Sequence, residues 1–259
     1  QTSVEASPVC NRPSTKSSLA DITKNCNNTF IMAKKVLVVL TSADKIVKLD
    51  KPTGWYLPEL AHPYDVLAPK AEIVVASPKG GIAPLDPSSI DMFKSDESSV
   101  NFLNNHKSVW EKTTPLKEFI GRSDEFDALF YPGGHGPMYD LVTDQDSIKL
   151  IEEFYNAGKP VAAVCHGPIV FRDAKGKSGE PLLKGKNVTG FTNVEEDQVQ
   201  LSAAMPFLLE DELKKVGANF LAADQPWGEK VVVDGLIISG QNPASAKGVG
   251  EAIAKAIGV

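Results

Sequence analysis

The side chains best suited to chemistry are Cys165 and His166, which end the apolar run VAAVCHGP (Val161–Pro168). A buried cysteine at the end of a strand usually behaves as a small hydrophobe. Here Gly167 and Pro168 follow directly, which indicates a sharp turn into a helix. Backbone N–H groups and the positive end of that helix would then lower the pKa of the thiol. Such a turn, the nucleophile elbow of hydrolases, would also let His166 act as a base.

A second candidate is the glycine-rich segment GGHG (Gly133–Gly136), which also follows a strand-like run. It can be a turn that merely reverses the chain. Alternatively, its glycines let backbone N–H groups approach a substrate oxygen and form an oxyanion hole. Neither the Walker spacing nor GxGxxG is present, which argues against a phosphate site.

A third candidate is Glu59, which lies in the amphipathic stretch GWYLPELAHP. A single glutamate on a helix is usually a solvated residue. If Glu59 points into a cleft of aromatic side chains, its pKa is raised and it can exchange a proton with a thiol. The residues of this stretch alone do not decide between the two interpretations.

Strand-like and helical patterns alternate along the chain and would position these residues. We predict strands at 36–42, 72–77, 127–134, 160–167 and 218–223, a hairpin at 231–240, and helices at 143–157, 206–218 and 243–257. The first four runs are continuously apolar, which is typical of parallel strands buried on both faces. Residues 84–115 have no clean period, and we interpret them as an insertion with short helices of its own. The alternation predicts a doubly wound, mostly parallel α/β sheet, whose ligands bind at the carboxyl ends of the strands.

Composition excludes several functional classes. The 259 residues are 42% hydrophobic and carry a net charge of -6, which gives no basic surface for nucleic acid or an anionic membrane. No apolar run approaches the roughly 18 residues of a spanning helix. The cysteines Cys10, Cys26 and Cys165 are too few and too scattered for a disulfide framework or a zinc cluster.

Residues 1–31 differ from the rest of the chain. They are rich in polar residues, show no period and lack the apolar stretch of a secretory signal, so we predict a disordered leader or tail. Met32 then opens MAKKVLVVLTS, which is typical of the start of a cytosolic chain. We therefore expect a single domain over residues 32–259 and a cytoplasmic location.

Four segments together resemble a known family. GGHGPMYDL, AVCHGPIVF, KNVTGFTNVEE and LIISGQNPASA occur in the order found in the ThiJ/PfpI superfamily. They are most similar to its glutathione-independent (class III) glyoxalase branch, whose members are also described as heat-shock chaperones. The resemblance covers residues 33–259, and it implies a flavodoxin-like fold with the nucleophile on an elbow.

The resemblance also implies roles for residues. Cys165 would be the nucleophile and His166 the base of a triad, and Glu59 would hydrogen-bond the sulfur and shuttle protons. Glu196 best matches the acid of the triad, with Glu195 and Asp197 as neighbouring alternatives. Gly134, His135 and Gly167 would border the oxyanion site. Some bacterial relatives bind zinc through two histidines and a carboxylate. The sequence does not indicate such a set among His62, His106, His135 and His166, and so we expect no metal and no cofactor.

The function that these expectations favour is conversion of methylglyoxal and water to D-lactate, without glutathione, through a hemithioacetal on Cys165. The same thiol could act on methylglyoxal adducts, as a protein deglycase. The alternatives are a cysteine amidase or peptidase, and a holdase chaperone or oxidation sensor with unfolded proteins as clients. Expected partners are thus a small 2-oxoaldehyde, client proteins and a second copy of the chain in a homodimer, with no nucleic acid or membrane.

Overall fold

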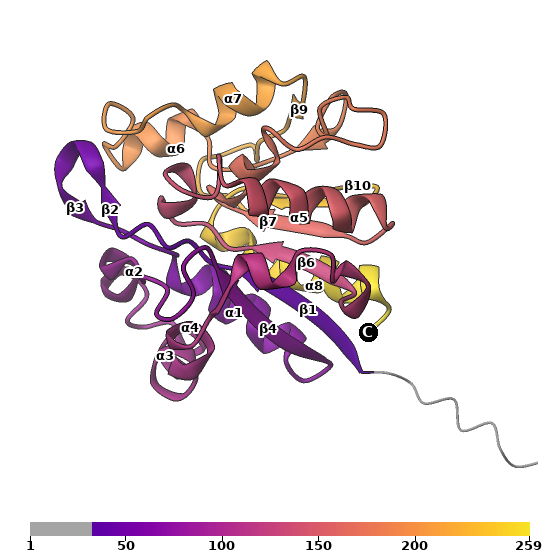
Figure 1. The fold of residues 1–259 in the computed structure, drawn as a ribbon. Coiled ribbons are helices and arrows are strands. Elements are labelled where there is room, and N and C mark those ends of the chain that lie inside the picture. The colour runs from indigo at the N-terminus through magenta and orange to yellow at the C-terminus, as the bar shows by residue number, and fades with distance from the viewer. Residues whose placement is uncertain (1–32) are drawn as a thin grey trace, which may run out of the picture. The chain divides into compact units, whose positions relative to one another are not determined.

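A computed structural model describes residues 33–259 (Figure 1). The predicted leader, residues 1–31 with Cys10 and Cys26, lies outside the described residues. The described chain forms an α/β fold in which helices cover both faces of a seven-stranded sheet. This arrangement confirms the predicted fold class.

The sheet has the order β10-β11-β7-β6-β1-β4-β5, and every neighbouring pair is parallel except the hairpin of β10 and β11. The hairpin turns at Gly235 and Leu236, within the segment 231–240 where the sequence predicts it. The strands of this sheet are β1 (Lys34–Val39), β4 (Ala71–Ser77), β5 (Thr114–Pro115), β6 (Ala128–Tyr131), β7 (Val161–Val164), β10 (Val231–Asp234) and β11 (Ile237–Gly240).

The strand predicted at 218–223 is wrong in both length and place. Only β9 (Asn219–Phe220) is extended there, and it pairs with β8 (Asn187–Val188) in a separate two-stranded sheet. The side chains that follow β9 face solvent, so this run lacks the two-sided burial of a parallel strand. β11 takes the position beside β7 instead. A second small sheet joins β2 (Lys45–Ile46) to β3 (Lys51–Pro52).

Alternating side chains of the sheet build two hydrophobic cores. On β6, Leu129 and Tyr131 face one core, which they share with α5. Ala128 and Phe130 face the other core, which they share with α1 and α8. Figure 1 shows α5 and α8 on opposite sides of the strands. The helices are α1 (Leu57–Leu67), α2 (Pro87–Met92), α3 (Glu97–Asn105), α4 (Lys107–Glu111), α5 (Gln145–Asn156), α6 (Asn193–Gln198), α7 (Leu209–Lys215) and α8 (Ala246–Ile257).

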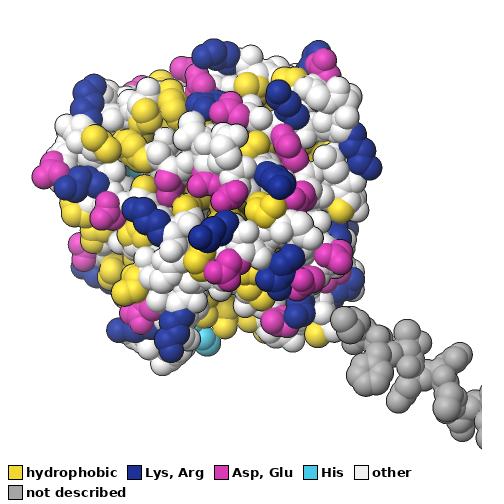
Figure 2. Space-filling view, viewed as in Figure 1, with side chains coloured by type: hydrophobic (Ala, Val, Ile, Leu, Met, Phe, Trp, Pro, Cys, Tyr) yellow, Lys and Arg dark blue, Asp and Glu magenta, His cyan; other side chains and the backbone are white. Residues whose placement is uncertain are grey.

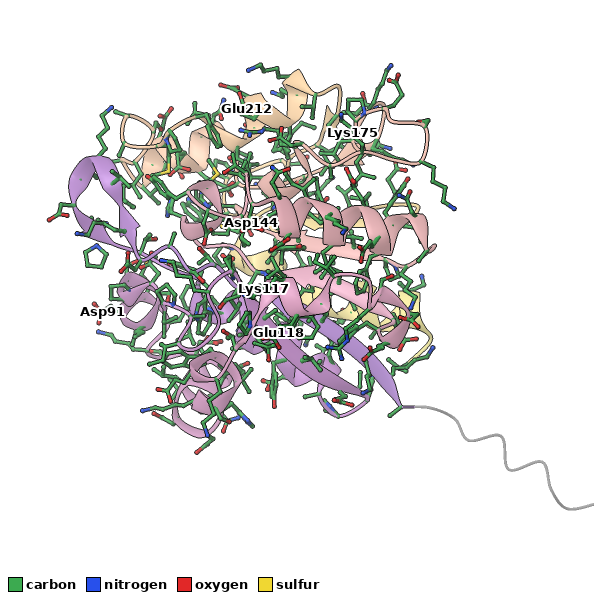
Figure 3. All side chains as sticks on the ribbon, viewed as in Figure 1. Asp91, Lys117, Glu118, Asp144, Lys175 and Glu212 are labelled. Atoms are coloured by element: carbon green, nitrogen blue, oxygen red, sulfur yellow. The ribbon has the colours of Figure 1, made fainter. Side chains whose placement is uncertain are left out.

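The observed helices differ from the predicted ones mainly at their ends. The predicted helix 143–157 is α5, which starts after Asp144 because this side chain caps the backbone N–H of Ser147 (Figure 3). The predicted helix 206–218 shortens to α7, and the predicted helix 243–257 becomes α8 after one 3-10 turn. Helices α2, α3 and α4 fall within residues 84–115.

The strand order reverses at β1, because the chain adds β4 on one side of β1 and later adds β6 on the other side. The loops after β6, β7 and β11 therefore meet at the carboxyl edge, where doubly wound sheets bind ligands.

On the outer surface, acidic and basic side chains are interspersed over the face in Figure 2. Over residues 33–259, no helix combines the length and the apolar character that crossing a membrane requires.

Candidate active site

Cys165 lies on a strained turn between β7 and the 3-10 turn Gly167–Phe171. Its φ of 60° is in the left-handed region, which costs a non-glycine residue about 1 to 3 kcal/mol and persists only where the surroundings fix it. The surroundings do so here. The Cys165 N–H donates to Gly240 O at 2.9 Å, and Phe191 N–H donates to Cys165 O at 2.8 Å. This geometry is that of a nucleophile elbow.

Gly167 makes the elbow compact. A Cβ atom on it would lie 2.4 Å from the carbonyl oxygen of Tyr131 and 3.3 Å from the Cβ of Ala163. Only glycine therefore lets the turn pack against β6. Gly167 does not line the pocket described below, so its visible role is packing.

His166 connects the sulfur to a carboxylate. Its Nδ1 lies 3.4 Å from Cys165 Sγ, and its Nε2 lies 2.6 Å from Glu196 Oε2. Burial lowers the pKa of His166, and the neighbouring His135 lowers it further. Burial opposes ionisation of Glu196, but the two imidazoles prevail and hold its pKa below the usual range. A neutral His166 then donates Nε2–H to the carboxylate and leaves the Nδ1 lone pair facing the thiol.

The structure separates the three acidic candidates of the triad. Glu196 is the one that meets His166. Glu195 is buried one residue earlier, and its Oε1 accepts hydrogen bonds from the backbone N–H of Trp227 and from the side-chain amides of Gln241 and Asn242. Glu195 also forms a capping box with Thr192 at the start of α6. Asp197 accepts a hydrogen bond from Ser202 instead.

Glu59 is fully buried in the first turn of α1. Its Oε2 accepts a hydrogen bond from the backbone N–H of Gly133 at 2.8 Å. Within the described residues, Oε1 has no partner that meets hydrogen-bond geometry. Burial raises the pKa of Glu59 to about 8, against the opposing interactions with the Cys165 thiol and with Gly133. Glu59 is therefore a mostly neutral carboxyl at pH 7, and it lies beside the sulfur.

The thiol itself differs from the expectation of a lowered pKa. Cys165 is only 4% exposed, and burial raises the pKa of its thiol well above the usual value, with the charge of Glu59 as the next cause. The backbone N–H of Gly134 opposes this shift. The resting sulfur is therefore protonated and enclosed. It needs a base at the moment of attack rather than a preformed thiolate.

Gly134 and His135 both line the pocket. Gly134 has a φ of 80°, and a Cβ atom on it would lie 2.2 Å from the carbonyl oxygen of Gly54. Only glycine therefore fits at this position, and its backbone N–H interacts with the Cys165 sulfur. The His135 side chain instead reaches Glu196, with Nε2 2.9 Å from Glu196 Oε1 and its ring 4.1 Å from that of His166.

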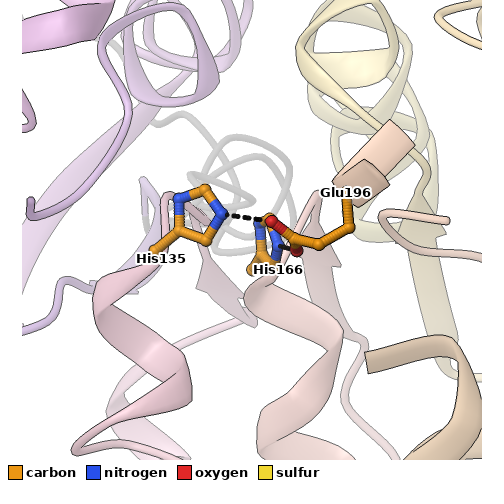
Figure 4. Close-up of side chains that lie close together, drawn as sticks. All are labelled: His135, His166 and Glu196. Atoms are coloured by element: carbon orange, nitrogen blue, oxygen red, sulfur yellow. Dashed lines mark hydrogen bonds and ion pairs between the residues drawn. The ribbon is translucent and has the colours of Figure 1, made fainter. Parts of the chain in front are cut away.

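Two histidines and a carboxylate do come together, contrary to the expectation that no such set exists. The ligand atoms of His135, His166 and Glu196 lie within 4.8 Å of one another (Figure 4). Both Nε2 atoms are already hydrogen-bonded to the carboxylate, one to each oxygen. A metal ion would have to replace both hydrogen bonds, so the three side chains fit a proton relay better than a metal site.

The site opens into a pocket of about 530 Å³ whose walls are mainly apolar. Sequence reasoning missed most of these walls. The ring of Phe191 lies against that of His166, tilted by 35° with centroids 4.4 Å apart, and Trp227 meets Phe191 edge to face. Phe191 directly follows Gly190 in the segment KNVTGFTN, so a glycine–aromatic step was its only signal. No sequence pattern marks Trp227, because a tertiary hydrogen bond from its backbone N–H to Glu195 holds its loop at the site.

Comparisons with known proteins show which proteins the chain is similar to. The chain is 35% identical over 223 residues to "Glyoxalase 3" of Candida albicans, which covers 82% of this chain and 93% of that protein. It is 34% identical over 225 residues to "Glutathione-independent glyoxalase HSP31" of Saccharomyces cerevisiae, with the same coverage. The crystal structure of glyoxalase III from Candida albicans superposes with a TM-score of 0.77 at 31% identity, over 86% of this chain and 97% of that one.

The sequence model of the DJ-1/PfpI family matches residues 57–256, which include Glu59, the elbow and Glu196. Together with relatives at about 35% identity over most of the chain, this match confirms the resemblance read from the four motifs. The chain is a member of the DJ-1/PfpI family.

Proposed function

We propose that the protein is a glutathione-independent glyoxalase of the cytoplasm, which converts methylglyoxal and water to D-lactate without a cofactor. The observation that carries this proposal is Glu59, a buried carboxyl with a pKa of about 8 next to a buried thiol. A hydrolase needs a nucleophile and a base, whereas an isomerisation also needs a proton carrier beside the reacting carbons. The names of the relatives support the same activity for a small carbonyl substrate.

In the first step, Nδ1 of His166 takes the thiol proton while Sγ of Cys165 bonds to the aldehyde carbon C1. The electron pair of the C=O bond moves onto oxygen, which receives the proton from His166 and gives a hemithioacetal. The neutral His166, with Nε2–H donated to Glu196, has the free lone pair that this transfer requires. The Gly134 N–H is the donor available to the developing oxyanion.

In the second step, the ionised form of Glu59 removes the proton from C1. The electrons of the C1–H bond form a C1=C2 double bond, and the electron pair of the C2=O bond moves onto oxygen, which gives an enediolate. Nδ1 of His166 takes the proton of the C1 hydroxyl and passes it to the C2 oxygen. Glu59 then returns its proton to C2, and C1 becomes a thioester carbonyl. A pKa near the operating pH suits a group that must both take and give a proton.

In the third step, His166 takes a proton from water as the water oxygen bonds to the thioester carbon. The C–S bond breaks, the sulfur recovers its proton, and the 2-hydroxy acid leaves. The isomerisation is redox-neutral, because C1 is oxidised as C2 is reduced. No external oxidant or reductant is consumed, which is consistent with a reaction that needs only water.

The test compares the purified wild type with Glu59→Gln, using methylglyoxal in buffer without glutathione. Glutamine keeps the volume but carries no proton, so D-lactate formation should fall by roughly two orders of magnitude or more. The matched control is Glu251→Gln on the exposed side of α8, which should leave the rate unchanged. Full activity of Glu59→Gln, or hydrolysis of amide substrates in place of lactate formation, would return the site to an amidase or peptidase.

A further inference from the structure

The pocket is larger than methylglyoxal requires. Its volume of about 530 Å³ lies in the range that encloses drug-sized ligands, roughly 300 to 1,000 Å³. Methylglyoxal has three carbons, and its one apolar group is a methyl. The reacting atoms at Cys165 and Glu59 would use only the bottom of this space, so the upper part is available to another portion of a ligand.

One wall of the upper part is aromatic. The ring of Phe191 lies 4.4 Å from that of His166, and the ring of Trp227 lies 5.5 Å from that of Phe191. The three rings form a continuous surface that leads from the triad histidine towards the mouth of the pocket. Aromatic surfaces of this kind favour flat apolar ligand groups, with an added preference for other rings.

Trp227 is held in this place at a conformational cost. Its φ of 65° lies in the left-handed region, where a bulky residue is strained. Its backbone N–H donates to Glu195 Oε1 at 2.8 Å, and its indole N–H donates to Gln198 Oε1 at 2.6 Å. The residue is nevertheless 41% exposed, so burial in the core does not hold it there. The two hydrogen bonds hold it where it lines the pocket.

Residues from the N-terminal half of the chain complete the upper part. Tyr56 meets Phe93 edge to face with centroids 5.9 Å apart, and the Tyr56 hydroxyl lies 3.2 Å from Met92 Sδ. Met92 lines the pocket yet is 69% exposed. A methionine adapts its shape to an apolar ligand and makes favourable contacts with aromatic rings.

We propose that the site prefers 2-oxoaldehydes, R–CO–CHO, in which R is an aryl or a bulky apolar group. This inference rests on the proposed function and specifies its substrate class. The two carbonyls would lie at Cys165 and Gly134, and R would lie against Phe191, Trp227 and Met92. The reaction adds one water and gives R–CH(OH)–COOH, so phenylglyoxal would yield mandelate by the same three steps.

The first test measures kcat/KM for phenylglyoxal and for methylglyoxal. The wild type should favour phenylglyoxal at least tenfold, because a phenyl ring buries much more apolar surface than a methyl group. The ratio should fall at least fivefold in Trp227→Ala and decrease in Met92→Ala. Ile82→Ala, at an exposed apolar residue outside the pocket, should keep it. An unchanged ratio in both pocket variants would overturn the proposal.

The second test does not depend on turnover. Mandelate and lactate are titrated by calorimetry into Cys165→Ala, which keeps the pocket without the reactive sulfur. Mandelate should bind at least tenfold more tightly than lactate, and adding Trp227→Ala should remove most of the difference. Equal affinities would overturn the substrate class. If neither aldehyde is turned over by the wild type while mandelate still binds selectively, the proposed function fails and the preference of the pocket stands.

Discussion

Glu59→Gln provides a quantitative test of the buried carboxyl through the pH dependence of stability. Burial raises the pKa of Glu59 from its ordinary 4.5 to about 8. Between these two values the folded protein keeps a proton that the unfolded chain has lost, so the wild type loses stability as the pH rises. The contribution is complete below pH 4.5 and is gone above pH 8. At 1.36 kcal/mol per pKa unit, the whole shift corresponds to about 5 kcal/mol.

Glutamine is neutral at every pH and close in shape to the protonated carboxyl. The stability of Glu59→Gln relative to the wild type should therefore increase by about 3 kcal/mol from pH 5.0 to pH 7.5, where most of this titration falls. Urea unfolding at steps of half a pH unit measures this difference, and all other groups cancel between the two proteins. The free energy of unfolding of Glu251→Gln should follow the same pH dependence as that of the wild type. If Glu59→Gln also follows it, Glu59 has an ordinary pKa and cannot be the proposed proton carrier.

Two further substitutions test the neighbouring carboxylates. Glu196→Gln should lower kcat for lactate formation by roughly 10² to 10⁴, because the amide no longer fixes the His166 tautomer; an unchanged kcat would remove Glu196 from the triad. Glu195→Gln should lower the free energy of unfolding by roughly 2 to 3 kcal/mol, because an amide N–H₂ group would face buried donors such as Trp227 N–H. Urea unfolding checks this second change, and an unaltered midpoint would contradict the role assigned to Glu195.

The elbow could be predicted because its residues are consecutive. Cys165, His166 and Gly167 follow a buried strand, and their order alone indicates a nucleophile turn. The carboxylate that contacts His166 is harder to predict, because Glu195, Glu196 and Asp197 are adjacent. Their positions around the axis of α6 decide which side chain faces His166. A signal was nevertheless present. Thr192 and Glu195 have capping-box spacing, which assigns Glu195 to the helix start and leaves Glu196 and Asp197 as candidates.

Other features depend on tertiary contacts that no local pattern contains. The helix-end argument predicted a lowered pKa for Cys165, but the sulfur is enclosed beside Glu59, which α1 brings from a distant part of the sequence. Burial then outweighs the backbone dipoles. Trp227 likewise reaches the pocket through a hydrogen bond to Glu195. The false strand at 218–223 has the composition of a strand but lacks a place in the sheet, because the hairpin strand β11 already pairs with β7.

In the proposed mechanism, the thiol of Cys165 forms a covalent intermediate with an aldehyde. The most direct test is D-lactate formation from methylglyoxal, without glutathione, by the wild type and by Cys165→Ser. Serine keeps the shape of the elbow, but its hydroxyl is a far poorer nucleophile at neutral pH. We therefore expect lactate from the wild type and nearly none from the variant, with similar melting curves. A serine variant that retains more than a few per cent of the wild-type rate would contradict covalent thiol catalysis.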